Sequence, residues 1–313
     1  MIGTKIISGV DASREEKLGP KTGNRVVAAR LYYSAKDDDE LPVKVKNAAG
    51  EMYQNPEFMN NGKHSLIVYN HGYGSYMEAN NKLCCELAAS GYIVVSVGHA
   101  YEASSLLLED GAVIKLDNSI KSRQISPRVK GMLSAFQLKK TTGTSEEMYA
   151  VFNLFQQKYC SFMNERLPEW AADVHFIVKK LKEDYSNYID FEKGIGITGH
   201  SFGGNLAYYM CMYYDEYVCG VNIDGAIFGD YTGQTMKKPF LQICNPGNVS
   251  VVSKALMDTN APTEFAIFEG ITHLGFTDMK FYVRSKMMMG KMPAQEMSDR
   301  LIGLHMKFFE RYL

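Results

Sequence analysis

The chain has 313 residues, a formal net charge of −1 and 46% hydrophobic residues. The near-zero charge and the lack of a dense run of Lys and Arg argue against a nucleic-acid partner. No stretch of the sequence is long and apolar enough to cross a membrane, and residues 1–17 lack the apolar centre of a signal peptide. We therefore expect a cytoplasmic protein with no integral membrane segment, with secretion left open if a leader has been removed.

The length allows a large hydrophobic core, because a chain of roughly 300 residues buries about three quarters of its unfolded surface. Six cysteines lie scattered in mostly apolar surroundings without CxxC spacing: Cys84, Cys85, Cys160, Cys211, Cys219 and Cys244. They are typical of small buried hydrophobic residues rather than of a disulfide or zinc framework. With no HExxH motif and no Cys/His cluster, the sequence predicts neither a metal nor a cofactor.

The first third of the chain alternates between strand and helix patterns. Residues 25–33 predict a strand, and residues 41–62 predict an irregular surface loop. The continuous apolar run at 65–70 is typical of a strand buried on both faces of a parallel sheet. A predicted helix over 77–90 and a further buried strand over 92–97 complete a βαβ unit.

The middle of the chain contains the least regular segment, residues 119–165. It follows a candidate hairpin around Asp110 and Gly111 and precedes a helix that we expect to begin near Pro168. Within it, one helical face is shared by Val151, Phe152, Phe155, Tyr159, Phe162 and Met163. This face fits an ordinary amphipathic helix packed on the core, and it also fits a helical cap, or lid, over an apolar pocket.

The last third continues the alternation. A short apolar strand from residue 194 is followed by a predicted helix over 205–214. Three further strands are predicted at 219–223, 239–244 and 264–268, and the chain ends in a helix over 298–312. No internal repeat or linker marks a second domain. The sequence therefore predicts one α/β domain over residues 1–313, with a doubly wound, mostly parallel sheet and a helical insertion at 119–165.

Residues 199–203 read Gly-His-Ser-Phe-Gly and lie between a predicted strand and a predicted helix. In that setting the pattern is typical of a nucleophile elbow, in which Gly199 and Gly203 leave room for a sharp turn that exposes the Ser201 hydroxyl. Gly194, Gly196 and Gly199 also match a dinucleotide-binding fingerprint, but they lie within the strand rather than in the turn that opens the helix. We therefore interpret Ser201 as a nucleophile.

A serine nucleophile needs a base, usually a histidine, and on this scaffold the base follows the serine in the chain. Two histidines lie after Ser201. His305 falls inside the predicted terminal helix, whereas His273 follows a predicted strand in a turn-like segment from which it could reach the elbow. We predict that His273 is the base; the alternative is a solvated loop histidine.

The acid that orients the base should leave the carboxyl end of a strand between Ser201 and the histidine. The strand at 219–223 ends at Asp224, which we predict to be this acid. Asp230 and Asp258 are the alternatives. An aspartate before a glycine is also a common turn residue, and this is the competing interpretation of Asp224.

Catalysis by such a nucleophile also needs two backbone N–H groups that bind a developing oxyanion. One belongs to the residue after the serine, here Phe202, and the other comes from the loop after an early strand. Residues 71–74 read His-Gly-Tyr-Gly, and the flanking glycines would let the Tyr73 backbone approach closely. Tyr73 and Phe202 are therefore the predicted donors, although His-Gly also fits a plain tight turn.

This set of motifs resembles the platelet-activating-factor acetylhydrolase branch of the α/β-hydrolases, and it is similar to bacterial polyester and cutin hydrolases. The resemblance extends over roughly residues 25–273, and Gly-His-Ser-Phe-Gly-Gly at 199–204 is its most specific part. It implies an α/β-hydrolase fold and a calcium-independent serine esterase for short or oxidised acyl chains. It also implies Ser201, Asp224 and His273 as the triad, with Tyr73 and Phe202 as oxyanion donors. The segments at 99–102 and 119–165 depart from the family pattern at the expected substrate entrance.

The main hypothesis is therefore a serine-dependent hydrolase of short- to medium-chain or lipid-derived esters that works through an acyl-enzyme. An acyltransferase or thioesterase with the same triad is an alternative, because the same acyl-enzyme can be resolved by water, an alcohol or a thiol. A catalytically inactive binding module on the same fold is a further alternative. The expected partner is a small or lipid-like ester, and the oligomeric state is left open.

Overall fold

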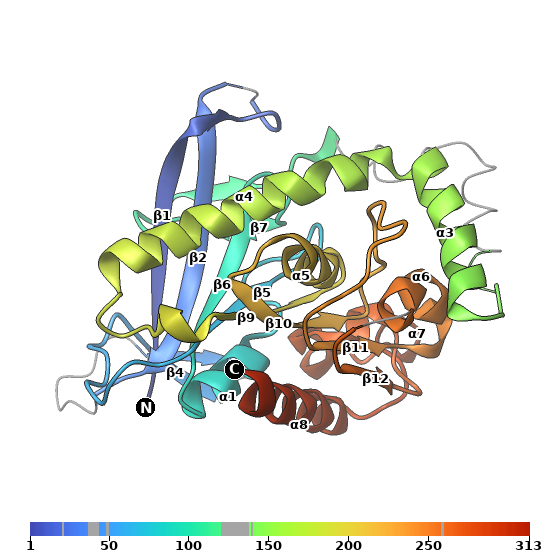
Figure 1. Ribbon diagram of the computed structural model, residues 1–313. Helices are drawn as coiled ribbons and strands as arrows, with labels where there is room; N and C mark the ends of the chain where they lie inside the picture. The colour runs from blue at the N-terminus through green and yellow to red at the C-terminus, as the bar shows by residue number, and fades with distance from the viewer. Residues whose placement is uncertain (21, 37–43, 48–49, 120–137, 139, 258–259) are drawn as a thin grey trace.

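The computed structural model describes residues 1–20, 22–36, 44–47, 50–119, 138, 140–257 and 260–313. Strands among these residues form a ten-stranded sheet and a separate two-stranded hairpin (Figure 1). The sheet contains β1 (Ile2–Glu15), β2 (Asn24–Ser34), β3 (Lys44–Asn47), β4 (Gly50–Gln54), β5 (Leu66–Asn70), β6 (Ile93–His99), β9 (Ile195–His200), β10 (Tyr217–Ile223), β11 (Phe240–Cys244) and β12 (Thr263–Ile267). The hairpin consists of β7 (Ser105–Leu107) and β8 (Val113–Lys115), as expected around Asp110 and Gly111.

The order of strands across the sheet is β12-β11-β10-β9-β5-β6-β2-β1-β4-β3. From β12 to β6 all neighbours are parallel, whereas β2 pairs antiparallel with β6 and with β1. The carboxyl ends of the parallel strands therefore meet at one edge. This edge receives the segments that follow β5, β9, β10 and β12, in which all the predicted site residues lie.

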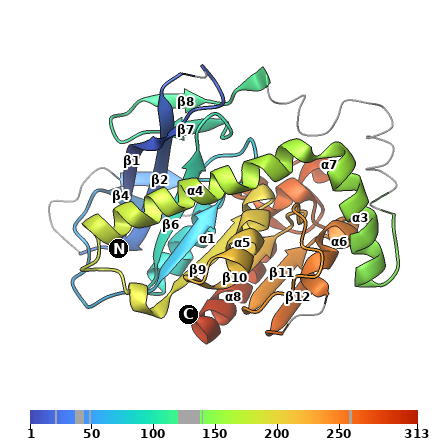
Figure 2. The same ribbon diagram turned by 45° about the horizontal axis from the view of Figure 1, so that its top comes forward.

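Helices cover both faces of the sheet (Figures 1 and 2). The described α-helices are α1 (Asn81–Ala89), α3 (Ser145–Tyr159), α4 (Ser161–Asp184), α5 (Phe202–Tyr213), α6 (Val249–Val252), α7 (Lys286–Met289) and α8 (Ala294–Tyr312). Single turns of 3-10 helix lie at η2 (Phe191–Lys193), η3 (Pro246–Asn248), η4 (Ser253–Leu256), η5 (His273–Phe276) and η6 (Asp278–Phe281).

Alternate residues of the buried strands serve two separate cores, one on each face of the sheet. Along β5, Leu66 and Val68 pack with α4 and α5, whereas Ile67 and Tyr69 pack with α1 and α8. Both faces of β5 are fully buried, which explains its continuous apolar run. The predicted doubly wound, mostly parallel sheet is confirmed.

Three predictions of local structure were wrong. The expected loop over 41–62 contains β3 and β4, and β4 joins the sheet edge by pairing with β1 (Gly3 with Tyr53). The first helix begins at Asn81 rather than at residue 77. Pro168 lies inside α4, not in its first turn. An interior proline costs a helix about 3 kcal/mol, and complete burial of the neighbouring Trp170 offsets a cost of that size.

The predicted insertion at 119–165 is described only in part, since residues 120–137 and 139 lie outside the described residues. Its second half forms α3 and the start of α4, which meet at Cys160. A capping box at Thr144 and Glu147 begins α3. Phe152 on α3 packs on Val251 and Val252 of α6, and Figures 1 and 2 show the two helices side by side.

Candidate active site

Ser201 lies in the tight turn between β9 and α5, with a backbone φ of 56° and ψ of −123°. Only very small neighbours allow this turn. A Cβ on Gly199 would overlap the backbone of Gly203, and a Cβ on Gly203 would overlap the backbone of Asn70 at the end of β5. The two glycines of the motif thus let β9, α5 and β5 approach closely, and the turn projects Ser201 beyond the edge of the sheet. Gly196 and Gly199 lie within β9, so they do not form a phosphate-binding turn.

His273 begins the 3-10 turn that follows β12, and its ring lies between Ser201 and Asp224. Its Nε2 is 2.8 Å from Ser201 Oγ, and its Nδ1 is 2.7 Å from Asp224 Oδ2. A carboxylate can only accept a hydrogen bond, so Nδ1 carries the proton and Nε2 accepts from the serine hydroxyl. The structure therefore brings the three residues together in the order that a serine nucleophile, its base and an orienting acid require.

Asp224 follows β10 directly and is fully buried. Besides His273, three donors hold its carboxylate: the backbone N–H of Asn245 and the side-chain amides of Asn245 and Asn248, at 2.7–3.0 Å. These amides hold the carboxylate in place without adding a charge. The sequence analysis missed both asparagines, although the segment that carries them was recognised as the exit of a strand.

The other sequence candidates that the structure describes, Asp230 and His305, lie elsewhere. Asp230 accepts hydrogen bonds from the backbone and hydroxyl of Thr232 in its own exposed turn. Asp258 lies outside the described residues. His305 is buried on α8, where it contacts the Thr198 hydroxyl and the Leu301 carbonyl.

His200, the residue before the nucleophile, is a third residue that the sequence analysis left without a role. Its Nε2 lies 2.9 Å from the backbone carbonyl of His273, so Nε2–H is the donor. Burial, together with the nearby His273, lowers the pKa of His200 to about 3. The ring is therefore neutral at physiological pH, and it anchors the backbone that carries His273.

The loop after β5 passes directly beside the nucleophile. A Cβ on Gly72 would lie 2.9 Å from Ser201 Cβ, which shows how closely this backbone approaches the serine. The Tyr73 ring packs edge-on against the Phe202 ring, with centroids 6.2 Å apart. Phe202 is the first residue of α5, where N–H groups have no partner within the helix. The structure thus places Tyr73 and Phe202 in contact with each other beside Ser201.

A cavity of about 420 Å³ opens at Ser201 and His273. Its walls are mainly apolar and are formed by Leu138, Phe152, Phe155, Met163, Phe228 and Val251. Phe152 and Phe155 come from α3, so the described part of the predicted insertion is a wall of this cavity. A larger groove of about 710 Å³ lies between β1 and α4, but charged residues such as Arg14 and Lys179 line it and it does not contain Ser201. The cavity at Ser201, with its mainly apolar walls, can therefore receive an apolar acyl group.

Within the described ranges, no three His, Cys, Asp or Glu side chains are grouped so that they could hold one metal ion. No helix within the described ranges has the length and apolar character needed to cross a bilayer.

Comparison with known families gives a consistent result. A family model described as platelet-activating factor acetylhydrolase, isoform II, matches residues 41–307. The platelet-activating factor acetylhydrolase of Bos taurus is 26% identical over 239 residues, which cover 70% of this chain and 49% of the relative. The Gallus gallus protein is 23% identical over 240 residues, covering 72% and 56%. The chain thus spans about half the length of the curated relatives it matches.

Among solved structures, a ferulic acid esterase from Streptomyces cinnamoneus matches with a TM-score of 0.75 and 20% sequence identity. The match covers 100% of this chain and 90% of that chain. Similarity at this level of identity concerns the fold alone. It confirms the α/β-hydrolase fold that the sequence predicts.

Proposed function

The chain belongs to the family of platelet-activating factor acetylhydrolase, isoform II, and we propose that it hydrolyses carboxylic esters through an acyl-enzyme on Ser201. The observation that carries the proposal is the pair of hydrogen bonds from Ser201 Oγ to His273 Nε2 (2.8 Å) and from His273 Nδ1 to Asp224 Oδ2 (2.7 Å). A serine hydroxyl becomes a nucleophile at neutral pH only when a base can take its proton, and this arrangement provides one.

In the proposed first half-reaction, His273 Nε2 takes the hydroxyl proton while Ser201 Oγ attacks the ester carbonyl carbon. The negative charge that develops on the carbonyl oxygen is held by the backbone N–H groups of Tyr73 and Phe202. The buried Asp224 carboxylate stabilises the imidazolium and holds the ring in position. The C–O bond to the alcohol then breaks, and His273 returns the proton to the leaving alkoxide.

In the second half-reaction, a water molecule takes the place of the alcohol. His273 removes a proton from this water as its oxygen attacks the acyl carbon, and the same two N–H groups hold the oxyanion. Collapse of the tetrahedral intermediate releases the carboxylic acid and restores the Ser201 hydroxyl with the proton from His273. Each turnover consumes one ester and one water and yields one acid and one alcohol.

The cavity at Ser201 supports short- to medium-chain acyl groups as substrates. Its volume of about 420 Å³ and its mainly apolar walls favour burial of an alkyl chain. Four of its wall residues are phenylalanines, and flat aromatic rings stack well on such walls: Phe152, Phe155, Phe202 and Phe228. An aromatic acyl group is therefore a second candidate. Platelet-activating factor, named in the relatives, is proposed as one ester to test.

The test is hydrolysis of p-nitrophenyl esters from acetate to decanoate, of methyl ferulate and of platelet-activating factor by wild type and Ser201→Ala. We expect turnover and fluorophosphonate labelling by wild type and neither by the variant, a loss of about 10⁴-fold or more in kcat. Labelling without hydrolysis would favour an acyltransferase, which added alcohol or thiol acceptors would reveal. The absence of both would favour an inactive binding module and reject the proposed function.

A further inference from the structure

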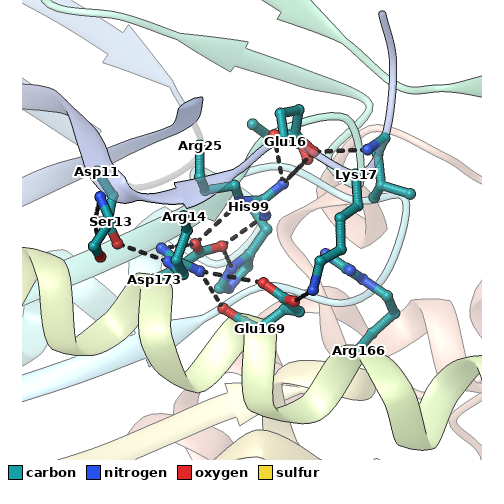
Figure 3. Close-up of polar contacts among 12 residues, drawn as sticks. Asp11, Ser13, Arg14, Glu16, Lys17, Arg25, His99, Arg166, Glu169 and Asp173 are labelled. Atoms are coloured by element: carbon teal, nitrogen blue, oxygen red, sulfur yellow. Dashed lines mark hydrogen bonds and ion pairs between the residues drawn. The ribbon is translucent and has the colours of Figure 1, made fainter. Parts of the chain in front are cut away.

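We propose that a buried cluster of charged residues positions the oxyanion loop, so that Arg166 and Glu102 are positioning residues for the reaction. The charged cluster consists of Arg25, Glu102, Arg166 and Asp173 (Figure 3 shows three of these with their neighbours), and the oxyanion loop consists of residues 72–75. This inference rests on the proposed function, since it assigns the loop a part in ester hydrolysis.

The members of the charged cluster come from distant parts of the chain and are held by specific hydrogen bonds. Arg166 Nε and Nη2 donate to the two carboxylate oxygens of Glu102, at 2.9 and 2.7 Å. Arg25 donates to both oxygens of Asp173, at 3.1 and 2.7 Å, and its Nη2 also lies 3.3 Å from Glu102 Oε2. All four side chains are at least nine-tenths buried. The cluster thus contains two bidentate ion pairs, Arg166–Glu102 and Arg25–Asp173, and bidentate contacts fix the orientation of both partners.

Glu102 connects this cluster to the oxyanion loop through its own backbone. Its carbonyl accepts a hydrogen bond of 2.7 Å from the Gly74 N–H, immediately after Tyr73. Two residues further on, the Ser104 N–H donates to the Ser75 carbonyl at 2.6 Å. The oxyanion loop is therefore hydrogen-bonded at two points to the turn that carries Glu102.

The turn that carries Glu102 needs outside support because its backbone is strained. Tyr101, which is not a glycine, adopts a φ of 63° there. Arg25 Nη1 donates to the carbonyl of Ala100 at 2.9 Å, so the charged cluster holds the turn on both sides of Tyr101. Loss of the Arg166–Glu102 contact would weaken one of these two attachments, since only the longer contact from Arg25 (3.3 Å) would then hold the Glu102 side chain.

A second connection runs through aromatic rings to the same two predicted oxyanion donors. Asp173 Oδ2 lies 2.9 Å from His99 Nδ1, and the His99 ring stacks on Trp170 with centroids 3.5 Å apart. The Trp170 ring in turn contacts the rings of Tyr73 and Phe202, at 6.1 and 4.7 Å between centroids. Arg166, Trp170 and Asp173 are spaced as neighbours on one face of α4. This face of α4 therefore supports the oxyanion loop through the ion pair to Glu102 and through the aromatic contacts of Trp170.

Burial of ion pairs is poor evidence for stability, since apolar residues of similar volume usually serve as well. A role in orientation is a better account of this cluster, because Arg25 donates to the Ala100 carbonyl and the Glu102 backbone carbonyl accepts from the Gly74 N–H of the loop. The region around it is balanced in charge: Arg14 at its edge contacts Asp173, and Glu16 contacts Arg25.

The experiment compares Arg166→Lys with the matched control Arg14→Lys. Both variants keep the positive charge and lose the planar guanidinium group. Arg14 contacts Asp173 and Glu169 but does not contact Glu102. We expect Arg166→Lys to lower kcat about tenfold with KM within twofold, less than the loss of a whole oxyanion donor. A trifluoromethyl ketone, whose adduct carries the oxyanion, should lose affinity by the same factor. Arg14→Lys should leave all three values within twofold, because Arg25 and His99 still hold Asp173 in that variant.

The rate of hydrogen exchange at the Gly74 amide, measured by mass spectrometry, tests the positioning role without depending on turnover. We expect it to be at least tenfold faster in Arg166→Lys than in wild type and unchanged in Arg14→Lys. Wild type that neither turns over esters nor takes the fluorophosphonate label would reject the proposed function. A fully active wild type with equal kcat in both variants would reject only the positioning role.

Glu102→Gln is the second variant, since it keeps the side-chain volume and one acceptor for Arg166. It should reproduce the split between a lower kcat and an unchanged KM. If Arg166→Lys and Glu102→Gln both fail to fold at temperatures where Arg14→Lys is folded, the charged cluster is a folding element and the positioning role is rejected.

Discussion

At the scale of single residues, backbone strain is concentrated around the site. Among the described residues, the non-glycine residues with positive φ are Asn55, Tyr101, Ser201 and Asp224. Ser201 and Asp224 end neighbouring parallel strands, and Tyr101 lies in the turn that supports the oxyanion loop. Each such residue costs about 1–3 kcal/mol, which persists only where the surroundings fix the conformation. The hydrogen bonds to Asp224 from Asn245 and Asn248 provide that kind of constraint.

The contact from His200 to the backbone of His273 leads to the first prediction at this scale. We expect His200→Leu to lower kcat about tenfold, because small misplacements of a catalytic group are costly. His200→Gln can still donate to the His273 carbonyl and should lose at most about threefold. Since the pKa of His200 is about 3, the ring stays neutral above pH 5 and the shape of the pH–rate profile should not change.

Steady-state kinetics with p-nitrophenyl butyrate from pH 5 to 9 would measure both variants. Thermal melting provides the control for folding. Full activity in a folded His200→Leu protein would show that the His273 backbone needs no such anchor.

At the scale of elements, α3 forms a wall of the cavity at Ser201, and we expect it to limit the length of acyl chain that the cavity accepts. Phe155 lines the cavity, whereas Leu154 on the same helix is 71% exposed. We expect Phe155→Ala to raise the ratio of kcat/KM for decanoate over acetate about tenfold. Room for two more methylenes, each worth about 0.8 kcal/mol on burial, gives a change of that order. The control Leu154→Ala should keep the wild-type ratio, and an unchanged ratio in Phe155→Ala would place the acyl chain elsewhere.

The elements that the sequence predicted well are those whose pattern is local. The runs at 65–70 and 92–97 are buried on both faces, so apolar composition alone identified them as strands. β4 escaped prediction because its place in the sheet comes from pairing with β1, nearly 50 residues away in the chain. The prediction for Pro168 was wrong because a contact distant in the chain again outweighs a local preference. Packing of α4 on the core overrides the local preference against an interior proline.

The same distinction applies to the site. Ser201, Asp224 and His273 could be proposed because each follows a strand, and parallel strands bring their carboxyl ends together. The charged cluster could not, because Arg25 and Asp173 are 148 residues apart and neither belongs to a recognisable motif. Their association follows only from the position of α4 across the face of the sheet.

At the scale of the whole molecule, buried histidines control the response to acid. His71, His200 and His305 are each at least 98% buried, and burial lowers their pKa values to about 3, 3 and 4. In the unfolded chain a histidine has a pKa of about 6.5. Because the folded values lie below the unfolded one, these groups favour folding above pH 6.5, and this contribution is lost as the pH falls towards the folded values.

We therefore predict a steep loss of stability between pH 6.5 and 5. Below pH 6.5 these three histidines bind about three more protons in the unfolded chain than in the folded one, which corresponds to about 4 kcal/mol per pH unit. Asp278 acts in the opposite direction, because burial raises its pKa to about 6 and the folded protein takes up a proton there over the same range. The free energy of unfolding should thus be about 5 kcal/mol lower at pH 5 than at pH 8, a large part of a typical total of about 5–15 kcal/mol. Urea unfolding at a series of pH values would measure it.

The control variant His305→Gln separates this effect from general acid sensitivity. Glutamine can still accept from the Thr198 hydroxyl and donate to the Leu301 carbonyl, the two contacts that His305 makes. His305 lies on α8, away from Ser201, so ester hydrolysis at pH 8 should not change. The difference in unfolding free energy between pH 8 and pH 5 should shrink by about 2 kcal/mol. A variant that loses as much stability as wild type over this range would show that His305 does not remain neutral in the folded protein.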